Sequence, residues 1–205
     1  MSPTPADSNS FMNFLDRVRA GDQRAAEELV RMYEPEIRRE VRLRMRDPRL
    51  RRDFDSIDIC QSVLGSFFVR ASLGQYDLQK PEDLIKLLVT MTRNKLVGQV
   101  RKQQTQKRDL GRRDAAGQEK LQTLADQHDG GRTPSLQVAN EELIQEFRKR
   151  MSPEELQIAE RRTQGLPWEA IATELGGTGE SCRKQLTRAM DRVSQELGLE
   201  ELPHE

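Results

Sequence analysis

Four long polar side chains near the C-terminus carry the clearest chemical pattern in this sequence. They follow the pair Gly176-Gly177 and are Arg183, Lys184, Gln185 and Arg188. Arginine can pair bidentately with guanine and glutamine with adenine in the major groove of DNA, and cationic side chains also bind phosphates. The set therefore predicts DNA recognition. A charged run on a helix is more often only a solvated surface, and that alternative stays open for each residue.

The surrounding sequence predicts the element that positions these side chains, a helix-turn-helix unit over residues 153–197. Pro167 suits a first helical position, and Gly176 suits a left-handed cap at the end of the same short helix. Thr178 can then cap a longer helix. The apolar positions of that helix recur at steps of three and four residues and are Cys182, Leu186, Ala189, Val193 and Leu197. The four polar residues lie outside this stripe, as in a recognition helix.

A second polar set lies on a predicted helix that begins near residue 56. Its apolar face is formed by Ile57, Cys60, Leu64, Phe67 and Phe68. The polar residues Asp55, Asp58 and Gln61 lie largely on another side of this helix. They could orient a contact with a cationic protein surface. Helix capping by Asp55 and plain solvation of Asp58 are the alternative.

A longer predicted helix, residues 82–102, has one broad apolar face and one polar side. On the polar side, the pair Arg93 and Asn94 is followed about a heptad later by the pair Arg101 and Lys102. Such a row could follow a phosphate backbone. The loop before it contains Tyr76, whose ring could stack on an unpaired base or pack in the core.

The composition predicts small helical domains and excludes one large core. The chain has 205 residues, of which only 4% are aromatic. Its 34 Lys and Arg residues balance 34 Asp and Glu residues, so the net charge is zero. The charges are nevertheless clustered, with arginines crowded between residues 38 and 52 and acids in the last residues, so local basic surfaces remain. Because no strand-like alternation is present, we predict an all-α fold.

The residues do not favour an enzyme, a metalloprotein or a membrane protein. His128 lies in a polar stretch and His204 in the tail, and no catalytic triad or phosphate-binding glycine loop is present. Cys60 and Cys182 fall in apolar helical phases and are interpreted as small buried hydrophobes. No apolar run approaches the ~20 residues that span a bilayer, and the polar first ten residues lack a signal-peptide core. We therefore expect no catalytic residue, metal or cofactor, and a reducing cytoplasm.

The chain divides into two predicted domains. The boundaries are a disordered N-terminus at residues 1–10, a first helical domain at 11–103, a linker at 104–137, a second helical domain at 138–199 and an acidic tail at 200–205. The linker is predicted to be flexible because Gln, Gly and charged residues replace apolar ones. We therefore expect the domains to move independently in the free protein.

Four motifs in this order resemble bacterial RNA polymerase sigma factors of the extracytoplasmic-function (ECF) class. They are RAGD at residues 19–22, DSIDICQSV at 55–63, LVTMTRNKL at 88–96, and GLPWEAIATELG at 165–176 followed by Arg183 and Leu186 to Ala189. Each motif is weak alone, but their order and spacing cover almost the whole chain. The sequence departs from the family pattern at Leu87, Gly98 and Cys182, where Trp, Asp and Val are common.

The resemblance implies a fold and a function. The first domain would be sigma region 2, a helical bundle, and the second would be the region 4 helix-turn-helix. The chain would direct core RNA polymerase to promoter DNA through −10 and −35 elements and assist melting. An anti-sigma or other regulatory protein could be a further partner. The alternative is a stand-alone helix-turn-helix regulator that does not bind polymerase.

The resemblance also implies roles for individual residues. Contacts with core polymerase would come from Asp55, Asp58, Gln61 and Ser62. Contacts with the −10 element would come from Tyr76, Arg93, Asn94, Lys95, Arg101 and Lys102. Contacts with the −35 element would come from Thr178, Arg183, Lys184, Gln185 and Arg188.

Overall fold

Every regular element in the described part of the protein is an α-helix. The computed structural model describes residues 5–44, 56–113 and 136–199. Its helices are α1 (Pro5–Arg19), α2 (Gln23–Arg44), α4 (Ser56–Ser72), α5 (Pro81–Arg113), α6 (Leu136–Arg150), α7 (Pro153–Thr163), α8 (Trp168–Leu175) and α9 (Gly179–Glu196). The prediction of an all-α fold is confirmed.

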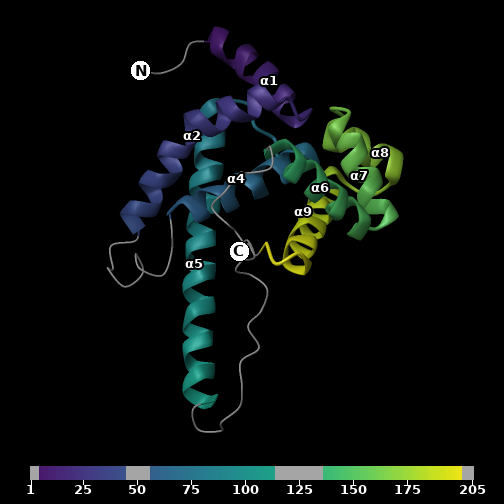
Figure 1. Cartoon of the computed structure of the whole chain (residues 1–205). Coiled ribbons are helices and arrows are strands. Elements are labelled where there is room, and N and C mark those ends of the chain that lie inside the picture. Colours follow the sequence, from purple (N-terminus) through teal and green to yellow (C-terminus); the bar gives the residue numbers. More distant parts are fainter. Residues whose placement is uncertain (1–4, 45–55, 114–135, 200–205) are drawn as a thin grey trace.

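The first four of these helices pack around one hydrophobic cluster. The apolar positions of α2 recur every four residues and form a stripe that is buried throughout, which consists of Ala25, Leu29, Tyr33, Ile37 and Val41. It faces buried residues of the other helices, including Leu15, Phe67 and Leu84. In Figure 1, α2 crosses the first half of α5, and α1 lies beside one end of α2. The buried residues of α2 thus follow the 3.6-residue helical period, whereas Ile57 of the apolar face predicted for α4 is 43% exposed.

Helix α2 is continuous through Pro35, although a proline within a helical stripe predicts a kink or a division of the helix. Proline removes one backbone hydrogen bond from a helix interior. Tyr33 and Ile37, on either side of it, are both buried. Burial of the stripe on both sides offsets the lost bond, so the helix is not divided.

Two helices extend beyond their predicted limits. Helix α5 reaches Arg113, ten residues past the predicted domain end at residue 103, and α1 begins at Pro5 within the stretch predicted to be disordered. Gln, Lys and Arg are good helix formers, so a helix can continue after its apolar stripe ends. Figure 1 shows this second half of α5 projecting away from the other helices. Residues 114–135 of the predicted linker lie outside the described residues.

Helices α6 to α9 surround a second cluster and have well-formed ends. The sequence Ser152-Pro153-Glu154-Glu155 is typical of a capping box, and the box is present at the start of α7. The Ser152 hydroxyl accepts the Glu155 N–H, and the Glu155 carboxylate accepts the Ser152 N–H. Helix α8 ends at Gly176, whose φ of 89° favours glycine, although its ψ of 159° is not the left-handed helical value that we expected. These ends fix the turn that precedes α9.

The second cluster also contains two residues of α4. Val69 and Leu73 pack with Phe147, Ile158 and the apolar stripe of α9. The predicted boundaries assign both residues to the first domain. In Figure 1, α4 runs from the N-terminal helices toward α6 and α9. The two groups of helices are therefore in direct contact through the C-terminal end of α4.

Candidate nucleic-acid interface

The C-terminal helix α9 presents the predicted polar set to solvent. Its buried side is formed by Cys182, Leu186, Ala189, Met190 and Val193. The opposite side carries exposed Arg183, Lys184, Gln185 and Arg188. Lys184 lies 3.3 Å from the Glu180 carboxylate, and both side chains are more than half exposed. An exposed pair of this kind is weak, so Lys184 can exchange Glu180 for a phosphate.

Thr178 has a structural role at the start of α9. Its hydroxyl accepts the backbone N–H of Ser181 at 3.1 Å, and its own N–H donates to the Ser181 hydroxyl at 3.0 Å. This reciprocal pair satisfies two backbone donors at the helix end. The predicted cap is confirmed.

A buried glycine lies where α8 and α9 approach each other. A Cβ at Gly179 would meet the carboxylate of Glu169 on α8, which is the far end of an exposed and flexible side chain and can move aside. Gly179 therefore marks a close approach of the two helices. Nothing in the local sequence distinguishes it from a simple turn residue.

The side chains on the polar side of α5 differ in their exposure and in their contacts. Arg93 is exposed, and its Nε donates to Glu40 Oε1 on α2 at 2.8 Å. Asn94 and Lys95 are half-buried, and the Lys95 ammonium lies 3.4 Å from the backbone oxygen of Leu199. Arg101 is exposed, whereas the side chain of Lys102 lies outside the described ones.

Glu40 holds two cations on the surface beside α5. Hydrogen bonds from Arg44 and from Arg93 lower the pKa of the Glu40 carboxyl below its ordinary value. The carboxylate is thus ionised and neutralises part of the charge of Arg93. DNA phosphates would have to compete with Glu40 for this arginine.

Tyr76 packs against the first hydrophobic cluster. Its ring stacks on Phe67 with centroids 5.9 Å apart and planes at 5°, and its hydroxyl lies 3.8 Å from the sulfur of Met91. The core packing that the sequence left open is therefore present. One face of the ring is occupied, which leaves at most the other for a base.

The start of α4 exposes two of the four residues predicted to contact polymerase. Asp58 and Gln61 are exposed and Ser62 is half-buried, while Asp55 lies outside the described residues. Ile57 is 43% exposed beside them, a large apolar side chain that sequence reasoning had assigned to the core side. An apolar residue among polar ones is the composition expected of a protein contact.

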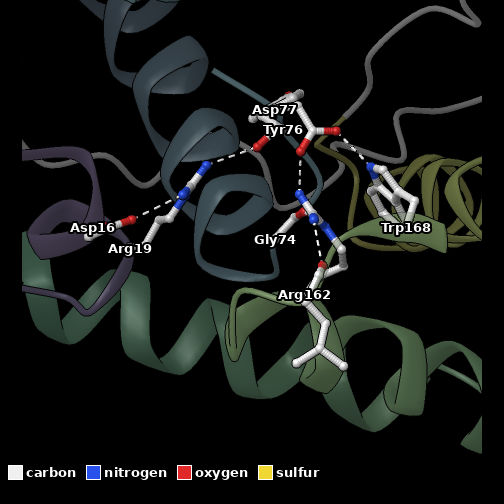
Figure 2. Close-up of polar contacts among 8 residues, drawn as sticks. Asp16, Arg19, Gly74, Tyr76, Asp77, Arg162 and Trp168 are labelled. Atoms are coloured by element: carbon white, nitrogen blue, oxygen red, sulfur yellow. Dashed lines mark hydrogen bonds and ion pairs between the residues drawn. The ribbon is translucent and has the colours of Figure 1, made fainter. Parts of the chain in front are cut away.

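A polar cluster that the sequence did not predict lies between the loop after α4 and the α7–α8 pair (Figure 2). Arg162 donates to the backbone oxygens of Gly74 at 3.1 Å and Leu166 at 2.8 Å, and it pairs with the Asp77 carboxylate. The indole N–H of Trp168 donates to Asp77 at 2.6 Å. The Arg162 guanidinium also lies 4.2 Å from the centre of the Trp168 ring. Trp168 is half-buried in this cluster and also packs against the second hydrophobic cluster.

Within residues 5–44, 56–113 and 136–199 the structure offers neither a metal site nor a membrane span. No group of three or more His, Cys, Asp or Glu there could hold a metal ion. No helix in these ranges is long and apolar enough to cross a bilayer. Burial raises the pKa of the Cys60 thiol to about 11, so this cysteine is a neutral core residue.

Comparison with known proteins identifies the family. A family model described as ECF sigma factor matches residues 8–198. No curated protein and no solved structure matches the chain. Sigma factors of this family are non-catalytic initiation factors that act with RNA polymerase in the cytoplasm. Because the match spans almost the whole sequence, the chain belongs to the ECF sigma factor family and takes part in promoter-specific transcription initiation by RNA polymerase.

Proposed function

We propose that this sigma factor reads a two-part promoter, with α9 at the −35 element and α5 and the loop before it at the −10 element. The observation that carries this proposal is the division of α9 into a buried apolar stripe and an exposed face of Arg183, Lys184, Gln185 and Arg188. Helix α8 and the Gly176-Gly177 turn precede α9, as in other helix-turn-helix units. The exposed face then lies in the major groove.

At the −10 element, α5 supplies cations and the loop at residues 74–80 receives an unstacked base. Arg93 and Arg101 are exposed on one side of α5 and suit backbone phosphates. When the loop holds one base out of the stack, it favours the single-stranded form of the promoter. The free energy of this binding therefore assists melting of the DNA duplex. Asn94, Lys95 and Lys102 of α5 belong to the same contact with the −10 element.

Core polymerase binds the exposed start of α4. Asp58 and Gln61 there are free to meet cationic and polar groups of the partner, and Ile57 adds apolar area. Asp55 and Ser62 belong to the same contact with core polymerase. Charge complementarity of this kind orients an assembly and rejects wrong partners.

Reversing the charge at Asp58 tests this assignment. Asp58→Lys should weaken binding to core polymerase about tenfold or more, because a cation would then face a cationic surface. The measurement is a titration of labelled sigma factor with core polymerase. Glu27→Lys, on the exposed side of α2, is the matched control. Wild-type affinity of Asp58→Lys, with helicity unchanged by circular dichroism, would show that α4 is not the polymerase contact.

A further inference from the structure

We infer that Arg192 is a positioning residue of α9. It ties the C-terminal half of this helix to the joint between α6 and α7, residues 150–155, and so fixes the angle at which the exposed face of α9 meets the −35 element. This role depends on the proposed function of α9, and it requires no contact between Arg192 and DNA.

The guanidinium of Arg192 has acceptors on three helices. Its Nη2 donates to Glu155 Oε2 at 2.7 Å. Its Nη1 donates to the backbone oxygen of Arg150 at 3.1 Å and to Glu196 Oε1 at 3.2 Å. Arg150 is the last residue of α6, Glu155 lies in the first turn of α7, and Glu196 lies one turn further along α9. One side chain therefore connects the ends of two helices to α9.

The two acceptors outside α9 are groups that belong to helix ends. The backbone oxygen of Arg150 lies in the last turn of α6, where carbonyls have no partner within the helix and the helix dipole favours a cation. Glu155 Oε2 also accepts the Ser152 N–H at 2.8 Å, as part of the capping box of α7. The cap therefore holds the Glu155 carboxylate in the place where Arg192 reaches it.

The remaining contacts of α9 restrain its angle less. Its buried residues pack against α6 and α7 (Figure 1), but burial of apolar surface is non-directional. The helix also follows Gly176 and Gly177, both with positive φ, and glycine restricts the backbone less than other residues do. Charge-assisted hydrogen bonds require a definite distance and direction. Arg192 thus supplies the directional restraint at the C-terminal half of the helix.

The contacts of Arg192 compete with a role in phosphate binding. Arg192 follows the exposed Arg188 by one turn, so the sequence alone groups the two cations. The Arg192 side chain is 43% exposed, and a single ion pair at such a position is weak. Here, however, three acceptors converge on one planar guanidinium, and the Glu155 side chain is only 15% exposed. A phosphate would have to displace all of them.

A recognition helix needs a fixed angle because base contacts tolerate little error. A functional side chain must be held within about 0.5 Å and 10 to 20° of its productive geometry. The polar face of α9 begins at Arg183, and Arg192 restrains the helix one turn beyond its last member, Arg188. A tilt of α9 displaces several side chains together. Loss of the restraint should therefore relax preference at several base pairs, whereas loss of one base reader relaxes it at one.

Arg192→Ala tests this role in the complex of the whole chain with core polymerase. Affinity for a promoter with both elements should fall about tenfold. The dependence on salt should keep its wild-type slope, because no phosphate contact is lost. Binding to a promoter fragment with the −10 element alone should not change. Arg148→Ala is the matched control, since it removes the same charge at an exposed position of α6.

A change at Glu155 separates a positioning role from a phosphate contact by the sign of its effect. Glu155→Gln removes the charge, but it keeps an oxygen for the capping box, which accepts either residue type. The variant should weaken promoter binding, and Glu155→Gln combined with Arg192→Ala should be no weaker than Arg192→Ala alone. If Arg192 bound a phosphate, its release from Glu155 would instead tighten promoter binding. Glu154→Gln is the matched control, since its carboxylate accepts the Ser152 hydroxyl.

Residual dipolar couplings of backbone N–H groups measure the angle between α7 and α9 without DNA. In the wild-type protein, the couplings of both helices should fit one common alignment. In Arg192→Ala, α9 should require a different orientation or show reduced order. Circular dichroism checks that the variant is folded at the temperature of the measurement.

Four results would overturn the positioning role. They are wild-type promoter affinity and preference in Arg192→Ala when Arg183→Ala loses them, a salt slope lowered by about one, tighter promoter binding by Glu155→Gln, and unchanged couplings in Arg192→Ala. The proposed function of α9 fails separately. In that case Arg183→Ala and Arg188→Ala would also keep wild-type preference, while Arg192→Ala would still change the couplings.

Discussion

At the residue scale, solvent exposure and existing ion pairs decide which polar side chains can bind DNA. The four residues on the outer face of α9 are exposed, and Lys184 has only a solvent-exposed partner in Glu180. Arg93 on α5 is also exposed but shares Glu40 with Arg44. We therefore expect α9 to contribute more to sequence preference than α5.

Alanine substitution of the α9 face separates base contacts from phosphate contacts. Loss of a bidentate arginine or glutamine contact should cost about 1 to 3 kcal/mol and relax preference at one base pair. Loss of a phosphate contact should weaken all sequences alike and lower the salt slope by about one. The measurement is binding affinity and base preference in the polymerase complex, on a promoter library at two salt concentrations. The four variants are Arg183→Ala, Lys184→Ala, Gln185→Ala and Arg188→Ala.

The matched control for this series is Gln195→Ala, an exposed position nearer the end of the same helix. It should leave both affinity and preference unchanged. Wild-type affinity and preference in all four variants would mean that α9 does not read the −35 element.

At the element scale, the direction of α9 depends on its first turn. Gly179 allows contact with Glu169, and the Thr178 and Ser181 pair closes the helix end. The buried stripe from Cys182 to Val193 then fixes the rotation of the helix about its axis. Together these features aim the polar face away from the core.

Thr178→Ala should reduce the free energy of unfolding by about 1 kcal/mol, because one backbone donor of α9 loses its partner. Thermal unfolding followed by circular dichroism should show a midpoint lowered by roughly 2 to 4 °C. Thr178→Ser keeps a hydroxyl and should retain most of the stability. An equal loss in both variants would rule out capping as the reason for the effect.

At the scale of the whole molecule, one buried ion pair joins the two groups of helices. Arg70 belongs to α4 and Asp191 to α9, and the arginine side chain is 1% exposed. Breaking a buried pair by removing one partner is far more costly than breaking a surface pair. The stability of the two groups is therefore coupled.

Asp191→Ala should cost about 3 kcal/mol, since it leaves the Arg70 charge without its counter-charge. Urea unfolding of the wild-type protein should show one transition, and that of the variant should show two, as the groups separate before they unfold. Glu180→Ala removes an exposed partner of Lys184 and should cost less than about 1 kcal/mol. A single transition of Asp191→Ala at the wild-type midpoint would show that the pair does not couple the groups.

The sequence by itself determined the helices, their buried faces and their caps. The stripes of α2 and α9, the Ser152 and Thr178 caps and the exposed α9 face all follow from residues three or four positions apart along the chain. Helical periodicity and capping are local, so one sequence displays them directly. The end of α5 was missed because helix formers continue where apolar residues stop.

Only the tertiary structure decided which surfaces meet. Asp77 and Arg162 are 85 positions apart, and Arg70 and Ser194 are 124 apart. The helical period predicts an apolar face for α4, but it does not say that Val69 packs against α6 to α9. A pairing between distant residues depends on the path of the whole chain, and no local pattern encodes that path. The contact between the two groups of helices therefore became visible only in the folded molecule.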